Sequence, residues 1–303
     1  MLSDCLARGG IGRYCLGPMA EWFLFLPQLR FGIEAIVARA SAAESAGFDG
    51  IAFIDHLEPP AAADQPIWEA MTLATWVAAH TERLRIGHLV LCDAFRHPAV
   101  LAKQAVTLSA VSGGRFELGL GSGSWPAEFT RFGLPDADDA KARAARLARD
   151  VAIIRDCWGC DGETPMTQKP LPPQRIPLLF GGTGKTTLAL ARQYGDWWNI
   201  PSHQLDRLPA LAPAAGAARV SLQQMVGFVP EGEDAAAIAE TSKRRFGYLG
   251  TGLVCGDAAA MVEHFAALAD RGVARFYVWF ADFAPPAVLH EFAETVITPM
   301  STR

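Results

Sequence analysis

Short apolar runs alternate with helix-length amphipathic segments along this chain, and this alternation constrains the fold more than any other feature. Runs with strand character occur at residues 22–27, 50–54, 85–91, 115–121, 177–180, 197–200, 220–229 and 275–280. Helical spacing of apolar residues follows them, near residues 33–47, 68–80, 98–111, 140–158, 185–194, 234–245, 258–271 and 286–297. Continuous apolar strands that alternate with helices are typical of a parallel sheet covered by helices.

The number of these units predicts a closed architecture. Eight strands, most followed by a helix, fit an α/β fold of the (β/α)8 TIM barrel type better than an open sheet, with loop insertions at its C-terminal face. Half of the 303 residues are hydrophobic, so the chain can bury a sizeable core. We expect residues 1–18 to form a loose leader and residues 19–303 to form one barrel domain.

Composition argues against several classes of protein. The formal net charge is −5 with no basic cluster, which disfavours nucleic acid as a partner. The sequence shows no membrane-length apolar run and no apolar core of a signal peptide, which predicts a cytoplasmic protein with no membrane partner. Cys157 and Cys160 lack a second pair, and the string HEFAE lacks the second histidine of a zinc-protease helix, so no metal site is predicted.

In a barrel of this kind, the residues after each strand build the site. The polar or glycine-rich segments in those positions are residues 55–60, 88–98, 121–129 and 181–185. Two of them, GSGS and GGTGK, are glycine-rich turns. We therefore expect the site to lie between the ends of the second to fifth strands.

The GGTGK turn resembles an ATP-binding loop but lacks its first glycine, because Leu179 stands at that position. A glycine-rich turn that opens a helix still presents backbone N–H groups and a positive dipole end to an anion. A tight turn without any ligand is the alternative. The second glycine-rich turn nearby favours a long phosphorylated cofactor held by both.

Three stretches carry a family resemblance: RHPAVLAKQAVTLSAVSGGRFELGLGSGSWPAEFTRFGLP, FDGIAFIDHL and IPLLFGGTGKTTLALARQYGDWWN. They resemble the bacterial luciferase-like oxidoreductase superfamily, whose members are (β/α)8 barrels that use FMN or the deazaflavin F420. The resemblance extends over residues 19–300, and the motifs HPAVLAK and SGGRFELGLGSG are most similar to those of the F420-dependent branch.

The resemblance implies roles for particular residues. His56, beside Asp55, would face the reactive ring of the cofactor, and a bulge at His88 and Leu89, often with a non-prolyl cis peptide, would support that ring. The remaining implied cofactor contacts are Gly121, Ser122, Gly123 and Ser124 beside the ring, and Gly181, Gly182, Thr183, Gly184 and Lys185 at the phosphate.

Catalysis is predicted to centre on His56, oriented by the carboxylate of Asp55, with Glu128 as a further candidate acid. The chain departs from the family where it carries Pro60 and Trp125, which we expect in the substrate pocket. His56 could instead be a structural strand-end residue, and His88 and His97 could be structural as well.

The leading functional hypothesis is an F420-dependent oxidoreductase that transfers hydride to or from a small organic molecule. An FMN-dependent monooxygenase is the alternative; it would need a separate flavin reductase, because no G-x-G-x-x-G motif for a nicotinamide cofactor is found. A barrel that binds flavin without turnover is a third reading. A homodimer is expected only from the resemblance. Trp68, Trp76, Trp197 and Trp198 are expected in the core.

Overall fold

The computed structural model describes residues 20–60 and 62–302, so the expected leader lies outside the described residues. The strands are β1 (Glu21–Phe25), β2 (Gly50–Phe53), β3 (Arg85–His88), β4 (Leu91–Cys92), β5 (Leu118–Gly121), β6 (Leu178–Gly181), β7 (Trp197–Pro201), β8 (Arg219–Phe228), β9 (Leu253–Gly256) and β10 (Val273–Phe280).

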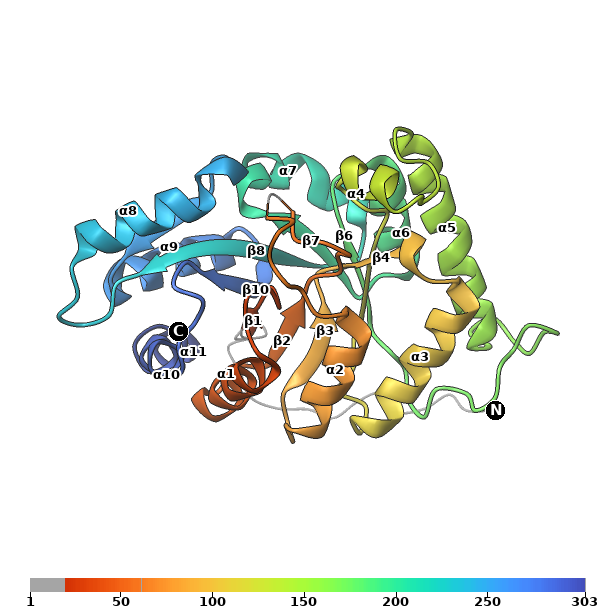
Figure 1. Ribbon diagram of the computed structural model, residues 1–303, viewed down its shortest axis with the longest axis horizontal. Helices are drawn as coiled ribbons and strands as arrows, with labels where there is room; N and C mark the ends of the chain where they lie inside the picture. Colours follow the sequence, from red (N-terminus) through yellow and green to blue (C-terminus); the bar gives the residue numbers. More distant parts are fainter. Residues whose placement is uncertain (1–19, 61, 303) are drawn as a thin grey trace, which may run out of the picture.

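The α-helices are α1 (Ile33–Ala46), α2 (Ala70–Ala79), α3 (Pro98–Val111), α4 (Pro126–Arg131), α5 (Ala140–Cys157), α6 (Lys185–Tyr194), α7 (Leu208–Leu211), α8 (Ala235–Phe246), α9 (Ala258–Asp270), α10 (Pro286–Phe292) and α11 (Thr298–Ser301). Shorter helical turns are η1 (Asp93–Phe95), η2 (Ser202–Arg207), η3 (Ala212–Ala215), η4 (Gly247–Leu249) and η5 (Ala293–Ile297). The helices surround the central strands (Figure 1).

All strand pairs are parallel, and the sheet closes on itself. Its order is β3-β2-β1-β10-β8-β7-β6-β5-β4. β3 and β4 are two segments of one stretch of chain, which the sequence predicts as a single strand. Because this stretch stands at both ends of the order, the sheet forms a closed ring. The bridge between Ile86 and Phe116 joins β3 to the residues before β5. The sequence-based prediction of an α/β TIM barrel is confirmed.

One strand, β9, was not predicted. It pairs with the second half of β8, from Met225 opposite Leu253 to Phe228 opposite Gly256. The pairing of β7 with β8 ends at Pro201 opposite Gln223, so β9 takes over the β7 side of β8 beyond that point. Its four residues form too short an apolar run to stand out beside a glycine-rich segment.

The side chains of each strand alternate between two apolar layers, as the pleat of a strand requires. Trp22 and Leu24 of β1 face the surrounding helices, in the large cluster that also holds Phe265 and Phe292. Phe23 and Phe25 face the barrel interior, in a smaller cluster with Tyr277 and Trp197. The barrel is therefore filled by side chains rather than open.

Charged side chains close the N-terminal end of the barrel. Arg275 is fully buried and pairs with Glu21 at 2.5 Å and with Glu117 at 2.5 Å. Its guanidinium carbon lies 3.7 Å from the ring centre of Trp197. Arg85 contacts the same two carboxylates. Because this network fills the N-terminal end of the barrel, we expect the ligand site at the C-terminal end.

The expectation for the tryptophans holds for two of the four. Trp197 and Trp198 are buried in β7. Trp68 and Trp76 are 40% and 51% exposed, so placing them in the core was wrong. Both lie in or just before α2, where the apolar stripe that packs on the barrel is already filled by Met71, Leu73 and Val77.

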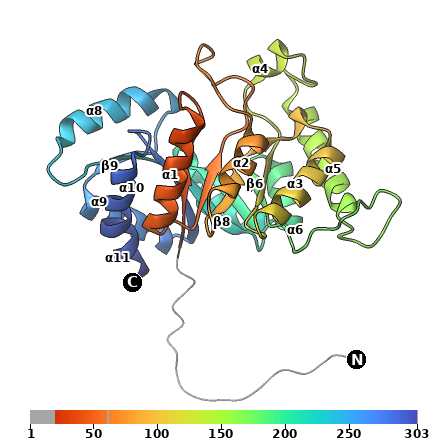
Figure 2. The ribbon, with the colours of Figure 1, turned by 60° about the horizontal axis from the view of Figure 1, so that its bottom comes forward.

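Long connections occur at both ends of the barrel. Long segments follow β2 and β5 at the C-terminal end, whereas the proline-rich segment of residues 158–177 joins α5 to β6 at the other end. The last helices return to the first, and α10 lies beside α1 (Figure 2). Within the described ranges, no helix has both the length and the apolar character needed to cross a bilayer.

Candidate active site

A cavity of about 470 Å³ opens at the C-terminal end of the barrel. It lies between the ends of β2, β4, β5 and β6 and has the size of an ordinary ligand pocket. Its lining consists of Ile54, Asp55, His56, Leu89, Val90, Leu91, Cys92, Gly121, Ser122, Gly123, Ser124, Glu128, Ala140, Lys141, Arg143, Ala144, Gly181, Gly182, Thr183, Gly184, Lys185, Thr186 and Thr187. The two glycine-rich turns and the histidine predicted from the sequence therefore meet in one place.

The imidazole of His56 is paired with Glu128. Its Nδ1 lies 3.0 Å from Oε2 of Glu128, which comes from the first turn of α4. The side chain of Glu128 is 1% exposed and that of His56 is 19% exposed. A buried carboxylate thus holds one side of a ring whose residue lines the cavity.

The other oxygen of Glu128 fixes the loop after β2. Its Oε1 accepts hydrogen bonds from the backbone N–H of Leu57 at 2.5 Å and of Glu58 at 3.3 Å. Carboxylate oxygens accept hydrogen bonds, so Nδ1 of His56 is assigned as the donor to Oε2. In the neutral imidazole, Nε2 is then the nitrogen with a free lone pair.

Asp55 does not orient His56, and that part of the sequence-based prediction was wrong. Its carboxylate accepts hydrogen bonds from the guanidinium of Arg96 at 2.6 and 2.9 Å and from the backbone N–H of Cys92 at 2.9 Å. Successive residues at a strand end point in opposite directions, so neighbours in sequence do not share a partner. Asp55 joins the end of β2 to the segment after β4.

Arg96 itself lies between two carboxylates, those of Asp55 and Glu69. Burial alone would lower the pKa of Arg96, but the hydrogen bonds and charges of both carboxylates raise it above its usual value. The guanidinium therefore stays charged and makes a permanent clamp at this edge of the site.

The break in the third predicted strand lies one residue later than expected. The cis peptide joins Leu89 to Val90, not His88 to Leu89. The N–H of Leu89 still donates to the carbonyl of Phe53 at 2.8 Å, so the ladder to β2 extends through residue 89. Leu89 and Val90 line the cavity.

His88 is not among the residues that line the cavity. Its ring is buried between Phe53 and Phe116, and its Nε2 lies 3.2 Å from the carbonyl oxygen of Ala70. Burial lowers the pKa of His88 to about 4. The ring is therefore neutral at ordinary pH.

The GGTGK turn forms one wall of the cavity. Gly184 precedes α6, and no side chain caps this helix start. The N–H groups of its first turn have no acceptor within the helix and favour an anion. Gly182 has φ of 122°, a conformation that residues with a Cβ rarely adopt. The turn has the shape and polarity of a phosphate-binding loop.

A second wall is basic, and the sequence did not reveal it. Lys141 and Arg143, both in the first turns of α5, line the cavity together with Lys185. Nη1 of Arg143 donates to the carbonyl oxygens of Asp136 and Ala137. In the sequence, Lys141 and Arg143 belong to the start of an amphipathic helix, and no motif marks them as ligand-binding residues.

Four further residues are relevant to the site, and only Cys92 among them lines the cavity. Pro60 and Trp125 do not belong to its lining; Trp125 immediately follows Ser124 and is 36% exposed, so a substrate contact there stays a prediction. Arg207, which the sequence did not single out, donates to Oγ1 of Thr183 at 3.1 Å. Burial raises the pKa of Cys92 to about 12, so its thiol stays protonated.

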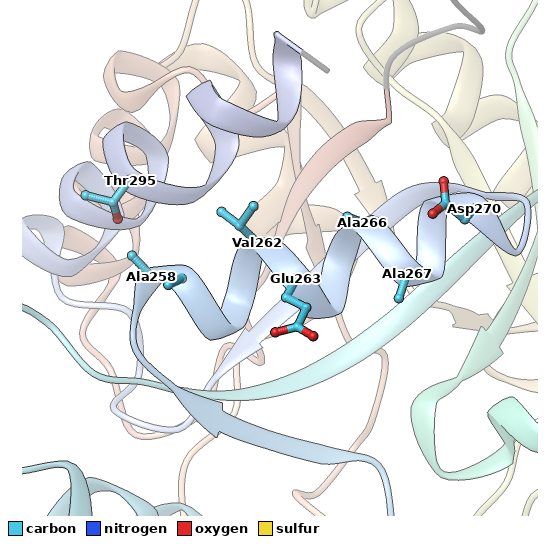
Figure 3. Close-up of a pocket in the computed structure, with 8 residues that line it drawn as sticks. Ala258, Val262, Glu263, Ala266, Ala267, Asp270 and Thr295 are labelled. Carbon is cyan, nitrogen blue, oxygen red and sulfur yellow. The ribbon is translucent and has the colours of Figure 1, made fainter.

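A larger hollow of about 660 Å³ lies on the outer face of α9, against Thr295 (Figure 3). Its only ionisable residues are Glu263 and Asp270, and it does not reach the strand ends. It lacks the convergent polar groups of a reactive site. The described part of the chain also holds no cluster of three or more metal-ligating side chains.

The family model of luciferase-like monooxygenases matches residues 21–224, more than half of the chain. The chain belongs to this luciferase-like family. The match includes β1 to β7 and every residue that lines the cavity. Membership places the chain among oxidoreductases.

Curated relatives are about a third identical to this chain over the part that aligns. An F420-dependent glucose-6-phosphate dehydrogenase of Beutenbergia cavernae is 32% identical over 202 residues, which cover 61% of this chain and 60% of that protein. An uncharacterised protein of Mycobacterium tuberculosis is 32% identical over 200 residues, 56% of this chain and 67% of that protein. The chain thus spans about 60% of the length of this dehydrogenase.

Solved structures share the fold of this luciferase-like chain. An F420-dependent secondary alcohol dehydrogenase in complex with an F420–acetone adduct has a TM-score of 0.78 and 18% identity, and covers 93% of this chain and 99% of its own. The monooxygenase RslO1 from Streptomyces bottropensis has a TM-score of 0.74 and 17% identity, and covers 92% and 99%. At these identities the likeness shows the fold alone.

Proposed function

We propose that this luciferase-like protein is an F420-dependent oxidoreductase that moves hydride between the deazaflavin and a carbon bearing a hydroxyl or carbonyl group. The observation that carries the proposal is the pairing of His56 with the buried Glu128 beside a glycine-rich anion-binding turn. A proton-transfer group and a phosphate cradle then share one cavity.

The residues present fit such a cofactor. The N-terminus of α6 and Gly182 offer N–H groups to a phosphate. A Cβ at Gly121, the last residue of β5, would lie 2.6 Å from the side chain of Val90, so the close approach of these two segments requires glycine here. Leu89, Val90 and Gly121 would form the apolar seat of the ring.

When bound, F420 supplies the hydride chemistry. His56 deals with the accompanying proton: its Nε2 accepts the proton of a substrate hydroxyl as hydride leaves carbon, and returns it in the reverse direction. Glu128 holds the ring through Nδ1 and stabilises the imidazolium that forms. Arg96 and Asp55 keep the ends of β2 and β4 in register beside it.

F420 is preferred over FMN because a relative at 32% identity is named as an F420-dependent dehydrogenase. This dyad also counts against a barrel that only binds flavin, since a structural histidine would not need a buried carboxylate at the edge of a cavity. An FMN-dependent monooxygenase supplied by a separate reductase is the second candidate, favoured by the monooxygenase RslO1 among the similar folds.

Titration of the purified full-length chain separates these functions. We expect F420 to bind with micromolar or better affinity and FMN to bind at least about tenfold more weakly, which is 1.4 kcal/mol. Mixing the F420 complex with a panel of alcohols should then reduce the deazaflavin without oxygen uptake. Tighter binding of FMN, with oxygen consumption on addition of reduced flavin, would establish the monooxygenase instead.

A further inference from the structure

One cation in the cavity wall is buried without a carboxylate partner. Arg143 of α5 lines the cavity and is only 8% exposed. None of the ion pairs formed by residues 20–60 and 62–302 includes it. Its Nε is buried and has no hydrogen-bond partner in that part of the chain. This is unusual, because arginines are almost never buried unless they are paired, and an unpaired buried charge is costly.

Arg146, one turn further along α5, shows the ordinary arrangement. It is buried as well, and its Nε lies 3.1 Å from Oδ2 of Asp93. Its Nη1 lies 2.7 Å from Oδ2 of Asp136. Arg146 does not belong to the lining of the cavity. Of these two arginines, the one that faces protein is paired with carboxylates and the one that faces the cavity is not.

The two carboxylates in the cavity lining are already engaged. Asp55 pairs with Arg96. Glu128 accepts hydrogen bonds from His56 and from two backbone N–H groups. The counter-charge of Arg143 is therefore left for a ligand to supply. An oxyanion bound between the start of α5 and the uncapped start of α6 would contact both the guanidinium and the free N–H groups.

Arg143 also holds the segment that carries Glu128. Residues 122–139 join β5 to α5 and include α4, and we call them the α4 segment. Phe129, next to Glu128, is 1% exposed, and its ring centre lies 5.4 Å from the guanidinium carbon of Arg143. Nη1 of Arg143 donates to two backbone carbonyl oxygens near the end of the same segment. One side chain thus contacts the cavity and two parts of the α4 segment.

These contacts link the charge in the cavity to the position of Glu128. The arrangement in which Glu128 meets His56 also buries Arg143 against Phe129, and a buried cation without a partner costs free energy. An oxyanion beside the guanidinium offsets this cost. It therefore binds this arrangement more tightly than one in which Arg143 is hydrated, and it shifts the population towards the arrangement that it prefers.

We propose that Arg143, together with the turn that precedes α6, binds the phosphate of the cofactor, and that this contact holds the α4 segment so that Glu128 stays against His56. Arg143 is then both a ligand of the phosphate and a positioning residue for Glu128. The pair of His56 and Glu128 is fully assembled only when the phosphate is bound. The inference rests on the proposed function in one respect, that the phosphate belongs to the cofactor.

The first test measures the binding of inorganic pyrophosphate to the cofactor-free full chain by calorimetry. Arg143→Met should weaken binding about tenfold or more, because it removes a buried charge that pairs with the anion. Lys141→Met is the matched control: Lys141 also lines the cavity but is exposed, so its loss should matter less than about threefold. Equal losses in these two variants, or no binding of pyrophosphate to the wild type, would overturn the site.

A second variant guards against a folding defect in Arg143→Met. Arg143→Gln keeps an amide donor for the backbone carbonyl oxygens but carries no charge. It should lose pyrophosphate binding to the same extent as Arg143→Met. Retention of wild-type affinity in Arg143→Gln would show that the charge does not bind the anion.

Amide hydrogen exchange tests the link to Glu128. The backbone N–H groups of Leu57 and Glu58 donate to Glu128, and neither residue lines the cavity, so they report on this carboxylate without touching a ligand there. Saturating pyrophosphate should slow their exchange about tenfold or more in the wild type. In Arg143→Gln, saturating pyrophosphate should leave their exchange unchanged. Pyrophosphate binding to the wild type without slower exchange would refute the positioning role.

Titrations with F420 separate this inference from the proposed function. F420 should slow the exchange of the same two N–H groups at a concentration at least about tenfold lower than glucose 6-phosphate. The opposite order would overturn the assignment of the phosphate to the cofactor. Failure of F420 to bind, with the pyrophosphate results in place, would refute the proposed function and leave the anion site standing. An unchanged Kd for F420 in Arg143→Gln would overturn this inference alone.

Discussion

At the scale of single residues, the chemistry of the site depends on one histidine and the carboxylate that holds it. His56→Ala should slow turnover at least about a hundredfold, because general acid–base help is worth about 10² to 10⁴ in rate. The Kd for F420 should change less than about threefold, since the phosphate loop is untouched. Steady-state kinetics alongside cofactor titration would check both; a loss of turnover only in proportion to lost binding would make His56 structural.

Glu128 acts through His56 and is a positioning residue. Glu128→Gln keeps the shape but removes the charge that stabilises the imidazolium, so kcat should fall by less than about a hundredfold and the pH profile of kcat should move. Asp55→Asn is the matched comparison, because its carboxylate binds Arg96 instead. It should lower stability and leave the pH profile in place. A shifted profile in Asp55→Asn would contradict this division of roles.

His88 should make the fold sensitive to acid. Its pKa is lowered to about 4 by burial, whereas an unfolded histidine titrates near 6.5. The folded state therefore binds its proton less readily, and the stability that neutral His88 contributes is complete above about pH 6.5 and is lost as pH falls towards 4, by up to about 1.4 kcal/mol per unit.

In the variant His88→Phe this contribution is absent. Urea unfolding at several pH values between 7 and 4 should therefore show a shallower fall for the variant than for the wild type. Parallel curves for the two proteins would show that His88 takes up its proton equally well in the folded state.

At the scale of elements, the turn that precedes α6 holds two glycines, Gly182 and Gly184, whose replacement by alanine should affect F420 binding differently. Gly182→Ala places a Cβ on a backbone with φ of 122°, which should weaken F420 binding about tenfold. Gly184→Ala should change little, because Gly184 has φ of −74° and its Cβ would lie 3.9 Å from Thr187.

The charge next to this turn should matter less than its backbone. Lys185 is exposed, and Lys185→Ala should weaken F420 binding by no more than about fivefold. Fluorescence titration of the three variants would rank them. A larger effect of Lys185→Ala than of Gly182→Ala would mean that the charge, and not the helix start, holds the phosphate.

At the scale of the whole molecule, the network at the closed end of the barrel joins strands from both ends of the chain. Arg275 of β10 contacts Glu21 of β1 and Glu117 just before β5. Arg275→Met would leave these carboxylates short of a partner and should cost about 3 kcal/mol or more in the free energy of unfolding.

Arg219→Met is the control for this network. Its side chain is partly exposed and makes one ion pair, with Glu21, so its loss should cost about 1 kcal/mol or less. Urea unfolding of both variants would test the difference. Equal costs would show that burial of Arg275 adds nothing to the closure of the barrel.

The sequence by itself determined the class of fold and the place of the site. Hydrophobic periodicity is local, so a run such as residues 50–54 shows its strand character without any knowledge of its neighbours. In a parallel barrel every strand ends at the same face, and the turns after β5 and β6 therefore had to meet. Glycine-rich turns are visible in sequence because backbone geometry demands that residue type.

Tertiary structure alone decided which side chains meet. Glu128 lies 72 positions from His56 along the chain, and nothing in either segment encodes the contact; the sequence suggested Asp55 because it is the neighbour. The exposure of Trp68 and Trp76 and the basic start of α5 also depend on strand order and helix rotation. Such contacts are set by the closure and register of the barrel, which local patterns do not carry.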